Sequence, residues 1–171
     1  MFFILALLSK GLAVSFALSL FAFDIINGHK FSIKSVVEKT PFLAIAFFSG
    51  IITIHFQKEG GYLNADHYFG MGKQVLFAGN ALGFYLMKFI VPVNLSAYYP
   101  YPVTIGISEF LFITIVVLFI AAIILLFKQK KNKAAGYLVL FLVNIIFVLQ
   151  LIPFGEVLTA DRYNYVGIIF L

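Results

Sequence analysis

Two basic residues interrupt the apolar sequence at positions that suit phosphate binding. Lys10 stands in the short turn Ser9-Lys-Gly11 between two apolar runs, and Arg162 is the only arginine of the chain. A planar guanidinium binds a phosphate or pyrophosphate through two hydrogen bonds, whereas a lysine acts as a point charge. We therefore predict that Lys10 and Arg162 bind the phosphate of a lipid.

Aromatic and acidic residues accompany these cations. The segment 92–102, called the tyrosine strip below, holds three prolines and three tyrosines in eleven residues, which predicts an extended, stiff segment. Aromatic rings of this kind stack on a sugar or contact a lipid head group, and a carboxylate next to Arg162 binds a sugar hydroxyl or orients the arginine. The candidate sugar or acceptor contacts are Tyr98, Tyr99, Tyr101, Asp161 and Tyr165.

Each of these residues also has a purely structural interpretation. Lys10 is equally typical of a lysine that reaches the membrane surface without a ligand. The tyrosines suit an ordinary aromatic belt, and Asp161 and Arg162 suit a local pair at the start of a helix. No spacing of His, Asp and Glu indicates a metal site, so we assign no metal ligand and no cofactor, and a requirement for a divalent metal stays open.

The composition indicates the kind of element that must position these residues. Of 171 residues, 63% are hydrophobic and 11% are charged, and the mean hydropathy is +1.05. Average soluble domains are roughly 45–50% apolar and about 25% charged. This composition excludes a water-soluble monomer. The net charge of +5 does not indicate nucleic-acid binding, because in so apolar a chain the location of the lysines matters more than their number.

The apolar runs predict an all-α fold, a polytopic transmembrane helical bundle with an extracytoplasmic loop that carries an interfacial helix. The predicted spans are 11–27, 41–57, 109–127 and 136–153, and the interfacial helix is 74–92. Truncated helices are expected at 2–8 and 165–171. Because both ends fall inside apolar runs, we expect residues 1–171 to be a partial membrane domain of a larger protein.

Two lysine-rich segments, 29–40 and 128–133, set the expected orientation. The positive-inside rule places both in the cytoplasm, so an even number of crossings must separate them. Three apolar segments lie between them. The weakest is 74–92, since Lys73, Gln74, Asn80 and Lys88 fall on one arc of its helical wheel, which suits a helix at the interface. The alternative is that this segment spans and one basic segment breaks the rule.

Three phrases of the chain resemble a known family. They are LALLSKGLAVSFALSLFAFDIINGHKF, FIVPVNLSAYYPYP and VLQLIPFGEVLTADRYNYVG. These phrases are similar to bacterial relatives of the transmembrane and tetratricopeptide-repeat O-mannosyltransferase-like proteins, which belong to the GT-C class of membrane glycosyltransferases. The similarity runs over nearly the whole chain.

The resemblance implies an enzyme that moves a sugar from a polyprenyl-phosphate donor to an acceptor protein or glycan outside the cytoplasm. By their positions in these phrases, the resemblance implies that Lys10, Arg162 and Tyr163 lie near the donor phosphate. The family's catalytic acid is expected upstream of this chain, and its tetratricopeptide repeats are expected downstream. The implied location is the bacterial inner membrane, in a multi-pass protein whose partners are membrane lipid, donor and acceptor.

Two other functions are open at this level. One is a segment of a transporter or flippase, although the cleanest spans lack the mid-membrane charges and repeats typical of transporters. The other is a non-catalytic membrane scaffold.

Overall fold

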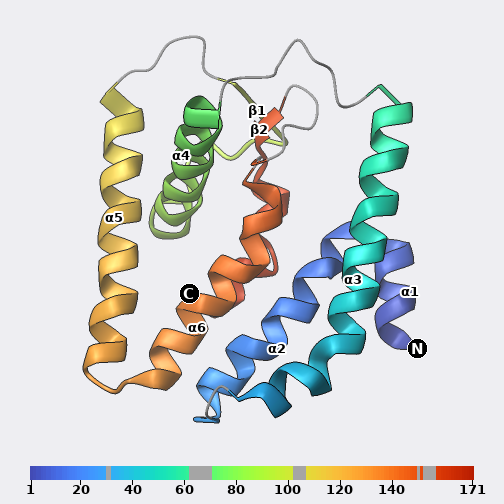
Figure 1. Ribbon diagram of the computed structural model, residues 1–171. Coiled ribbons are helices and arrows are strands. Elements are labelled where there is room, and N and C mark those ends of the chain that lie inside the picture. The colour runs from blue at the N-terminus through green and yellow to red at the C-terminus, as the bar shows by residue number, and fades with distance from the viewer. Residues whose placement is uncertain (30–31, 62–70, 102–106, 150, 152–156) are drawn as a thin grey trace.

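The computed structural model describes residues 1–29, 32–61, 71–101, 107–149, 151 and 157–171. Six α-helices form most of this described part (Figure 1). They are α1 (Phe2–Ser9), α2 (Ser15–Ile26), α3 (Ile33–Glu59), α4 (Met71–Ile90), α5 (Ile107–Lys128) and α6 (Asn132–Ile145). The 3₁₀ turns are η1 (Gly11–Val14), η3 (Ile146–Val148), η4 (Asp161–Asn164) and η5 (Gly167–Phe170). The strands β1 (Tyr99–Pro100) and β2 (Val157–Thr159) form an antiparallel pair. The fold is therefore mostly helical, as predicted, with one small strand pair that was not predicted.

Two of the described helices are long and apolar enough to cross a membrane. They are α3, with 27 residues, and the stretch Phe110–Lys128 of α5, with 19 residues. The predicted spans 11–27 and 136–153 instead form shorter apolar helical stretches, Gly11–Ile26 and Asn132–Val148. Length and composition alone thus support membrane association.

Helix α3 begins eight residues before the predicted span at 41. Ser32 caps its start, and the Ser32 side chain accepts a hydrogen bond from the backbone N–H of Ser35 at 3.3 Å. Pro41 therefore lies inside the helix and not in its first turn. Since proline has no N–H, the carbonyl of Val37 loses its helical partner there. Hydropathy marked the apolar part of the helix and missed its polar first two turns.

Both lysine-rich segments lie at the same end of the bundle (Figure 1). Helix α3 leads away from that end and α5 returns to it, while α4 lies beside the first half of α5 at the opposite end. The close approach of α4 and α5 requires Gly83, because an added Cβ there would lie 2.7 Å from the Cα of Phe112. Helices α3 and α5 thus run in opposite directions between the two ends of the bundle, and the expected number of membrane crossings stays a prediction.

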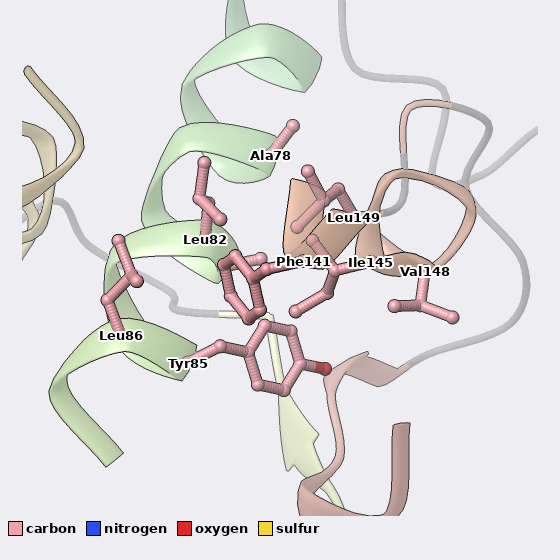
Figure 2. Close-up of a cluster of buried hydrophobic side chains, with 9 residues drawn as sticks. Ala78, Leu82, Tyr85, Leu86, Phe141, Ile145, Val148 and Leu149 are labelled. Carbon is pink, nitrogen blue, oxygen red and sulfur yellow. The ribbon is translucent and has the colours of Figure 1, made fainter. Parts of the chain in front are cut away.

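A cluster of buried side chains joins α4 to α6 and is drawn in Figure 2. Tyr85, Phe141 and Ile145 are fully buried in it. Its other members are Ala78, Ala81, Leu82, Leu86, Val148 and Leu149. Burial of these side chains stabilises the contact between α4 and α6. Helix α4 therefore packs on two neighbouring helices, α5 and α6.

The prediction that Asn80 lies on an exposed polar face of α4 is wrong. Its side chain is 4% exposed, and neither its nitrogen nor its oxygen has a hydrogen-bond partner among the described residues. The helical wheel placed Asn80 with Lys73 and Gln74, on the assumption that polar residues share the outer face. Because α4 packs against both α5 and α6, its buried surface is wider than one hydrophobic stripe and includes Asn80.

The predicted truncated helix at 165–171 is also not seen. The chain there forms the short 3₁₀ turn η5, which packs back against α6. Gly167 approaches the ring of Phe141 so closely that an added Cβ would lie 3.3 Å from it. Phe170 and Leu171 pack against the core cluster, and so the segment turns back on α6 and does not extend as a separate helix. The predicted helix at 2–8 is present as α1.

Candidate functional site

The tyrosine strip and the segment 160–165, which are far apart in the sequence, meet at the end of the bundle away from the lysine-rich segments. Strands β1 and β2 pair there, with Tyr99 opposite Thr159 and Pro100 opposite Val157. We call the backbone N–H of Ser96 and the side chains of Lys88, Tyr99 and Asp161 the Asp161 cluster. Only part of the predicted extended form is seen. Tyr99 and Pro100 form β1, whereas the chain bends at Asn94, and Pro102 lies outside the described residues.

Asp161 connects the two segments through one carboxylate oxygen. Its Oδ2 accepts a hydrogen bond from the backbone N–H of Ser96 at 2.6 Å and lies 3.0 Å from the hydroxyl of Tyr99. The Tyr99 hydroxyl is also 2.8 Å from the carbonyl oxygen of Asn94, so its single proton is shared between two acceptors. Within the described residues, Oδ1 of Asp161 accepts no hydrogen bond, which leaves it free to bind a hydroxyl group.

The phenol of Tyr99 is held in its protonated form. Partial burial and the hydrogen bond to the Asp161 carboxylate raise the pKa of Tyr99 above its ordinary value. Its ring packs edge-on against Phe84, with the ring centres 4.7 Å apart. Tyr99 therefore serves as a neutral hydrogen-bond donor to Asp161 and is fixed from both sides.

Lys88 fixes the segment that follows α4 by bonding its backbone. Its ammonium group donates to the carbonyl oxygens of Val93 and of Asn94, the latter at 3.1 Å. It also lies over the rings of Phe84 at 5.3 Å and Tyr99 at 5.6 Å. Asn94, with φ of 52°, adopts the left-handed conformation that turns the chain back toward the helix. Lys88, which the sequence offered only as a sign of an interfacial helix, thus positions the strip.

A buried tyrosine anchors the segment 160–165 to α4. The hydroxyl of Tyr85 donates to the carbonyl oxygen of Ala160 at 3.3 Å and accepts from the N–H of the same residue at 3.2 Å. Burial raises the pKa of Tyr85 well above its usual range, so the hydroxyl stays protonated. These two bonds satisfy both backbone groups of Ala160 and fix the residue that precedes Asp161.

Arg162 is exposed and makes no ion pair with any described residue. Its guanidinium carbon lies 5.4 Å from the centre of the Tyr163 ring. The structural interpretation of Asp161 and Arg162 as a local pair is therefore wrong, because the carboxylate turns to the tyrosine strip instead. The arginine is left with its hydrogen-bond donors available to an anion.

The other candidate residues occupy different positions around this cluster. Tyr98 and Tyr165 are exposed, at 59% and 70%. Tyr101 packs edge-on against Phe77, and burial raises the pKa of its phenol. Tyr163 is partly buried against the core cluster. Two of the five candidate sugar or acceptor contacts, Tyr99 and Asp161, are thus brought together directly.

Lys10 lies apart from the cluster, in the turn between α1 and η1. It is exposed, and no hydrogen bond or ion pair joins it to the Asp161 cluster in the described part of the chain. The next residue, Gly11, packs beside Thr53 of α3. Lys10 stands at the opposite end of α2 from the lysine-rich segment 29–40, as the alternation of helices predicted.

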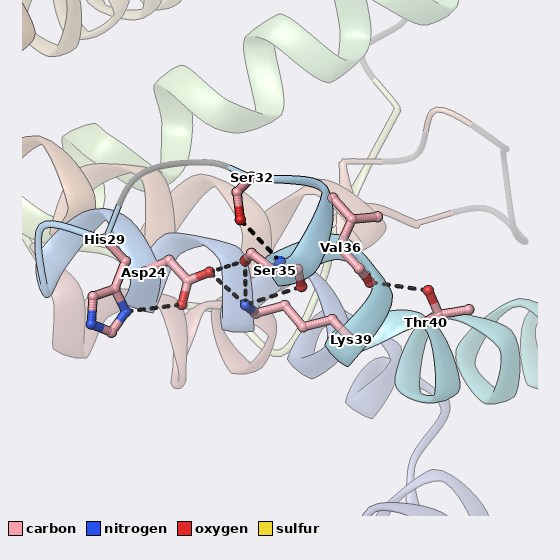
Figure 3. A network of polar contacts seen from close by, with 7 residues as sticks. All are labelled: Asp24, His29, Ser32, Ser35, Val36, Lys39 and Thr40. Carbon is pink, nitrogen blue, oxygen red and sulfur yellow. Dashed lines mark hydrogen bonds and ion pairs between the residues drawn. The ribbon is translucent and has the colours of Figure 1, made fainter.

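A second polar network, absent from the sequence-based candidates, lies at the lysine-rich end (Figure 3). Oδ2 of Asp24 accepts from the ammonium of Lys39 and from the hydroxyl of Ser35, each at 2.5 Å. The imidazole of His29 is 3.7 Å from Oδ1 of Asp24. The side chains of Lys39 and Asp24 are only 12% and 17% exposed, so this network ties α2 to α3. The signal in the sequence was an acidic residue inside an apolar run, which must find a partner.

No group of three His, Asp or Glu side chains that would hold a metal ion is present among the described residues. Asp66, His67 and Glu156, whose side chains are of types that bind metals, lie outside those residues.

Comparison with known protein families, with curated proteins and with solved structures found no match for this chain. The assignment of the Asp161 cluster therefore depends on its residue types and its geometry.

Proposed function

We propose that this chain is a segment of a membrane glycosyltransferase that transfers a sugar from a polyprenyl-phosphate donor to an acceptor protein or glycan outside the cytoplasm. The observation that carries the proposal is the meeting of the tyrosine strip and the segment 160–165 through Asp161. These are the two phrases on which the resemblance to the O-mannosyltransferase-like family is most specific. Their contact supports a common role for residues more than sixty positions apart.

The proposed location is a bacterial inner membrane, which the chain crosses several times. The length and hydropathy of α3 and α5 support this, as do the many exposed apolar side chains of these helices, such as Phe47, Ile52 and Leu118. With the lysine-rich end in the cytoplasm, the Asp161 cluster faces the outer side. Helix α4 would then lie in the outer interface.

The chemical roles follow from the free groups of the site. Arg162 binds the donor phosphate through two hydrogen bonds and stabilises the negative charge that grows on it as the sugar leaves. Lys10, which lies apart from the Asp161 cluster in the turn before α2, would bind a lipid phosphate on its own as a point charge. The free Oδ1 of Asp161 accepts a sugar hydroxyl, and the exposed rings of Tyr98 and Tyr165 flank the sugar or the acceptor. An acidic residue outside this chain would act as the base toward the acceptor hydroxyl.

Substitution of Arg162 in the full-length protein tests this proposal. We expect Arg162→Ala to lower sugar transfer about ten-fold or more at unchanged expression, since the variant loses donors that act on the charge of the transition state. Arg162→Lys should restore only part of the activity, because an ammonium does not make the paired hydrogen bonds of a guanidinium.

The matched control is Lys58→Ala, which removes an exposed positive charge at the last turn of α3. It should transfer sugar at the wild-type rate. Wild-type transfer by Arg162→Ala would remove Arg162 from the mechanism. Movement of the lipid-linked sugar across the membrane without transfer would instead support the transporter.

A further inference from the structure

Asn80, in the middle of α4, is a buried amide without a hydrogen-bond partner. The residue is 4% exposed, and neither its nitrogen nor its oxygen is bonded to any residue that the structure describes. Asn144 of α6 shows the usual situation, since its amide bonds the side chains of Ser15 and Ser19 and the carbonyl oxygen of Leu140. A buried amide that makes no bond destabilises the folded protein, so Asn80 indicates a ligand that bonds it in another state.

The tyrosine strip crosses the part of α4 that holds Asn80. Phe77, Asn80 and Phe84 share one face of the helix, because they are three and four residues apart. The ring of Tyr101 packs edge-on against Phe77, with the ring centres 5.4 Å apart. The ring of Tyr99 packs in the same way against Phe84, at 4.7 Å. The strip therefore runs along this face of α4 from Phe84 back to Phe77, and Asn80 lies beneath it.

Most of the hydrogen bonds that hold the strip lie at the surface of the protein. The bond from the N–H of Ser96 to Asp161 is exposed, as are those from Lys88 to the backbone of Val93 and Asn94. Segments that are held by exposed hydrogen bonds and few buried apolar contacts open locally more readily than the core. The strip is thus suited to leave α4 without unfolding of the bundle.

The segment 160–165 stays in place when the strip moves. Tyr85, which is fully buried, bonds both the N–H and the carbonyl oxygen of Ala160. These bonds come from α4 and do not involve the strip. Asp161 therefore remains beside α4, and only the strip has to move to expose Asn80.

We propose that the tyrosine strip is a movable cover over a sugar-binding surface of α4, where Asn80 bonds the sugar once the strip opens. An amide offers two N–H donors and an acceptor oxygen, which suit the neighbouring hydroxyl groups of a sugar. The rings of Phe77 and Phe84, on either side of Asn80, supply the apolar contact that such a binding site needs. The choice of a sugar rests on the proposed function, whereas the cover rests on the contacts of the strip alone.

Cysteine reactivity in the purified full-length protein tests the cover. Single cysteines replace Asn80 and Ala81, and mass spectrometry of the peptide that contains them measures their modification by iodoacetamide. Ala81 is the matched control, since it is buried in the next position of α4 but belongs to the core cluster with α6. Each cysteine is measured with and without Asp161→Ala, which removes the carboxylate that holds Ser96.

We expect Asn80→Cys to react slowly by itself and about ten-fold or more faster together with Asp161→Ala, because the strip then opens more often. Ala81→Cys should stay unreactive in both proteins. An unchanged rate for Asn80→Cys would overturn the cover, since the strip would not be what protects this position. An equal increase at both cysteines would also overturn it, since the whole helix would then have loosened.

Substitution of Asn80 by leucine tests the binding role of the amide. Asn80→Leu removes only an unbonded polar group, so its thermal midpoint in detergent should equal or exceed that of the wild type. Asn144→Leu, which removes a bonded amide, should lower the midpoint. We expect Asn80→Leu nevertheless to lower sugar transfer about ten-fold or more.

Wild-type transfer by Asn80→Leu, or a lowered thermal midpoint, would overturn the binding role of Asn80. If Arg162→Ala loses transfer while Asn80→Leu keeps it, this role fails and the proposed function stands. The cysteine rates do not require sugar transfer. They therefore decide on the cover even if the protein transfers no sugar.

Discussion

Asp161 holds the tyrosine strip with one carboxylate oxygen, while the other accepts no hydrogen bond from the described residues. Its Oδ2 receives the N–H of Ser96 and faces the hydroxyl of Tyr99, so the carboxylate acts first as the connection between two distant segments. The same arrangement determines the direction of Oδ1. A residue in this position is fixed before any ligand arrives, which is the condition for a precise contact to a sugar hydroxyl.

Removal of this carboxylate should release the strip. In Asp161→Ala, the amide of Ser96 loses a charge-assisted hydrogen bond of a kind worth about 1.5–3 kcal/mol. We expect hydrogen exchange in the peptide containing Ser96 to become about ten-fold faster or more. Tyr165→Ala, which removes a ring that is 70% exposed, is the control and should leave that exchange unchanged. Unaltered exchange in Asp161→Ala would show that the strip is held by other contacts.

Residue types in the sequence predicted two members of this cluster, Tyr99 and Asp161, but did not predict that they contact each other. Tyr99 and Asp161 were chosen because aromatic and acidic groups bind sugars, and the pattern contained nothing to show that they bind each other. Lys88 and Asp24 were missed as positioning residues, since their partners are backbone carbonyls and a lysine that only the fold brings near. Such contacts depend on tertiary packing, and one sequence carries little trace of them.

Helix α4 shows how much of an element can be predicted from its pattern. Its limits, Met71–Ile90, lie close to the predicted 74–92, because an apolar run of this length with few breakers favours a helix. Its buried face was harder to predict. A helix that packs against two neighbours buries positions on more than one side, and both Asn80 and Gly83 fall on the side that a single stripe would leave exposed.

The contact between α4 and α5 can be tested with two glycines of α4. In Gly83→Ala the new Cβ would lie 2.7 Å from the Cα of Phe112, so the helices must separate, and such overpacking costs roughly 1–3 kcal/mol. In Gly79→Ala the added Cβ has nothing within 4 Å, and alanine favours a helix over glycine by about 1 kcal/mol. Thermal unfolding in detergent should therefore show a lower midpoint for Gly83→Ala and an equal or higher one for Gly79→Ala. Equal midpoints for both variants would mean that α4 and α5 do not approach closely at Gly83.

At the scale of the molecule, the lysines and the hydropathy pattern predicted the overall arrangement better than its details. The expected even number of crossings requires one of the three apolar segments between the lysine-rich segments not to span. That topology stays a prediction, although α4 does lie at the far end of the bundle from the lysine-rich segments (Figure 1). The limits of α5, Ile107–Lys128, agree with the predicted 109–127 to within two residues. The strand pair β1–β2 was not predicted, since two or three residues are too few to give a period and their pairing spans more than fifty positions.

The central claim is that the lysine-rich segments and the Asp161 cluster face opposite sides of a membrane. The natural chain has no cysteine, so single cysteines can be placed at Tyr98 and at Lys131, both exposed, in the full-length protein. Treatment of intact cells with a membrane-impermeant maleimide should label Tyr98→Cys, whereas Lys131→Cys should react only after the cells are permeabilised. Labelling of both cysteines in intact cells, or of neither, would contradict the account.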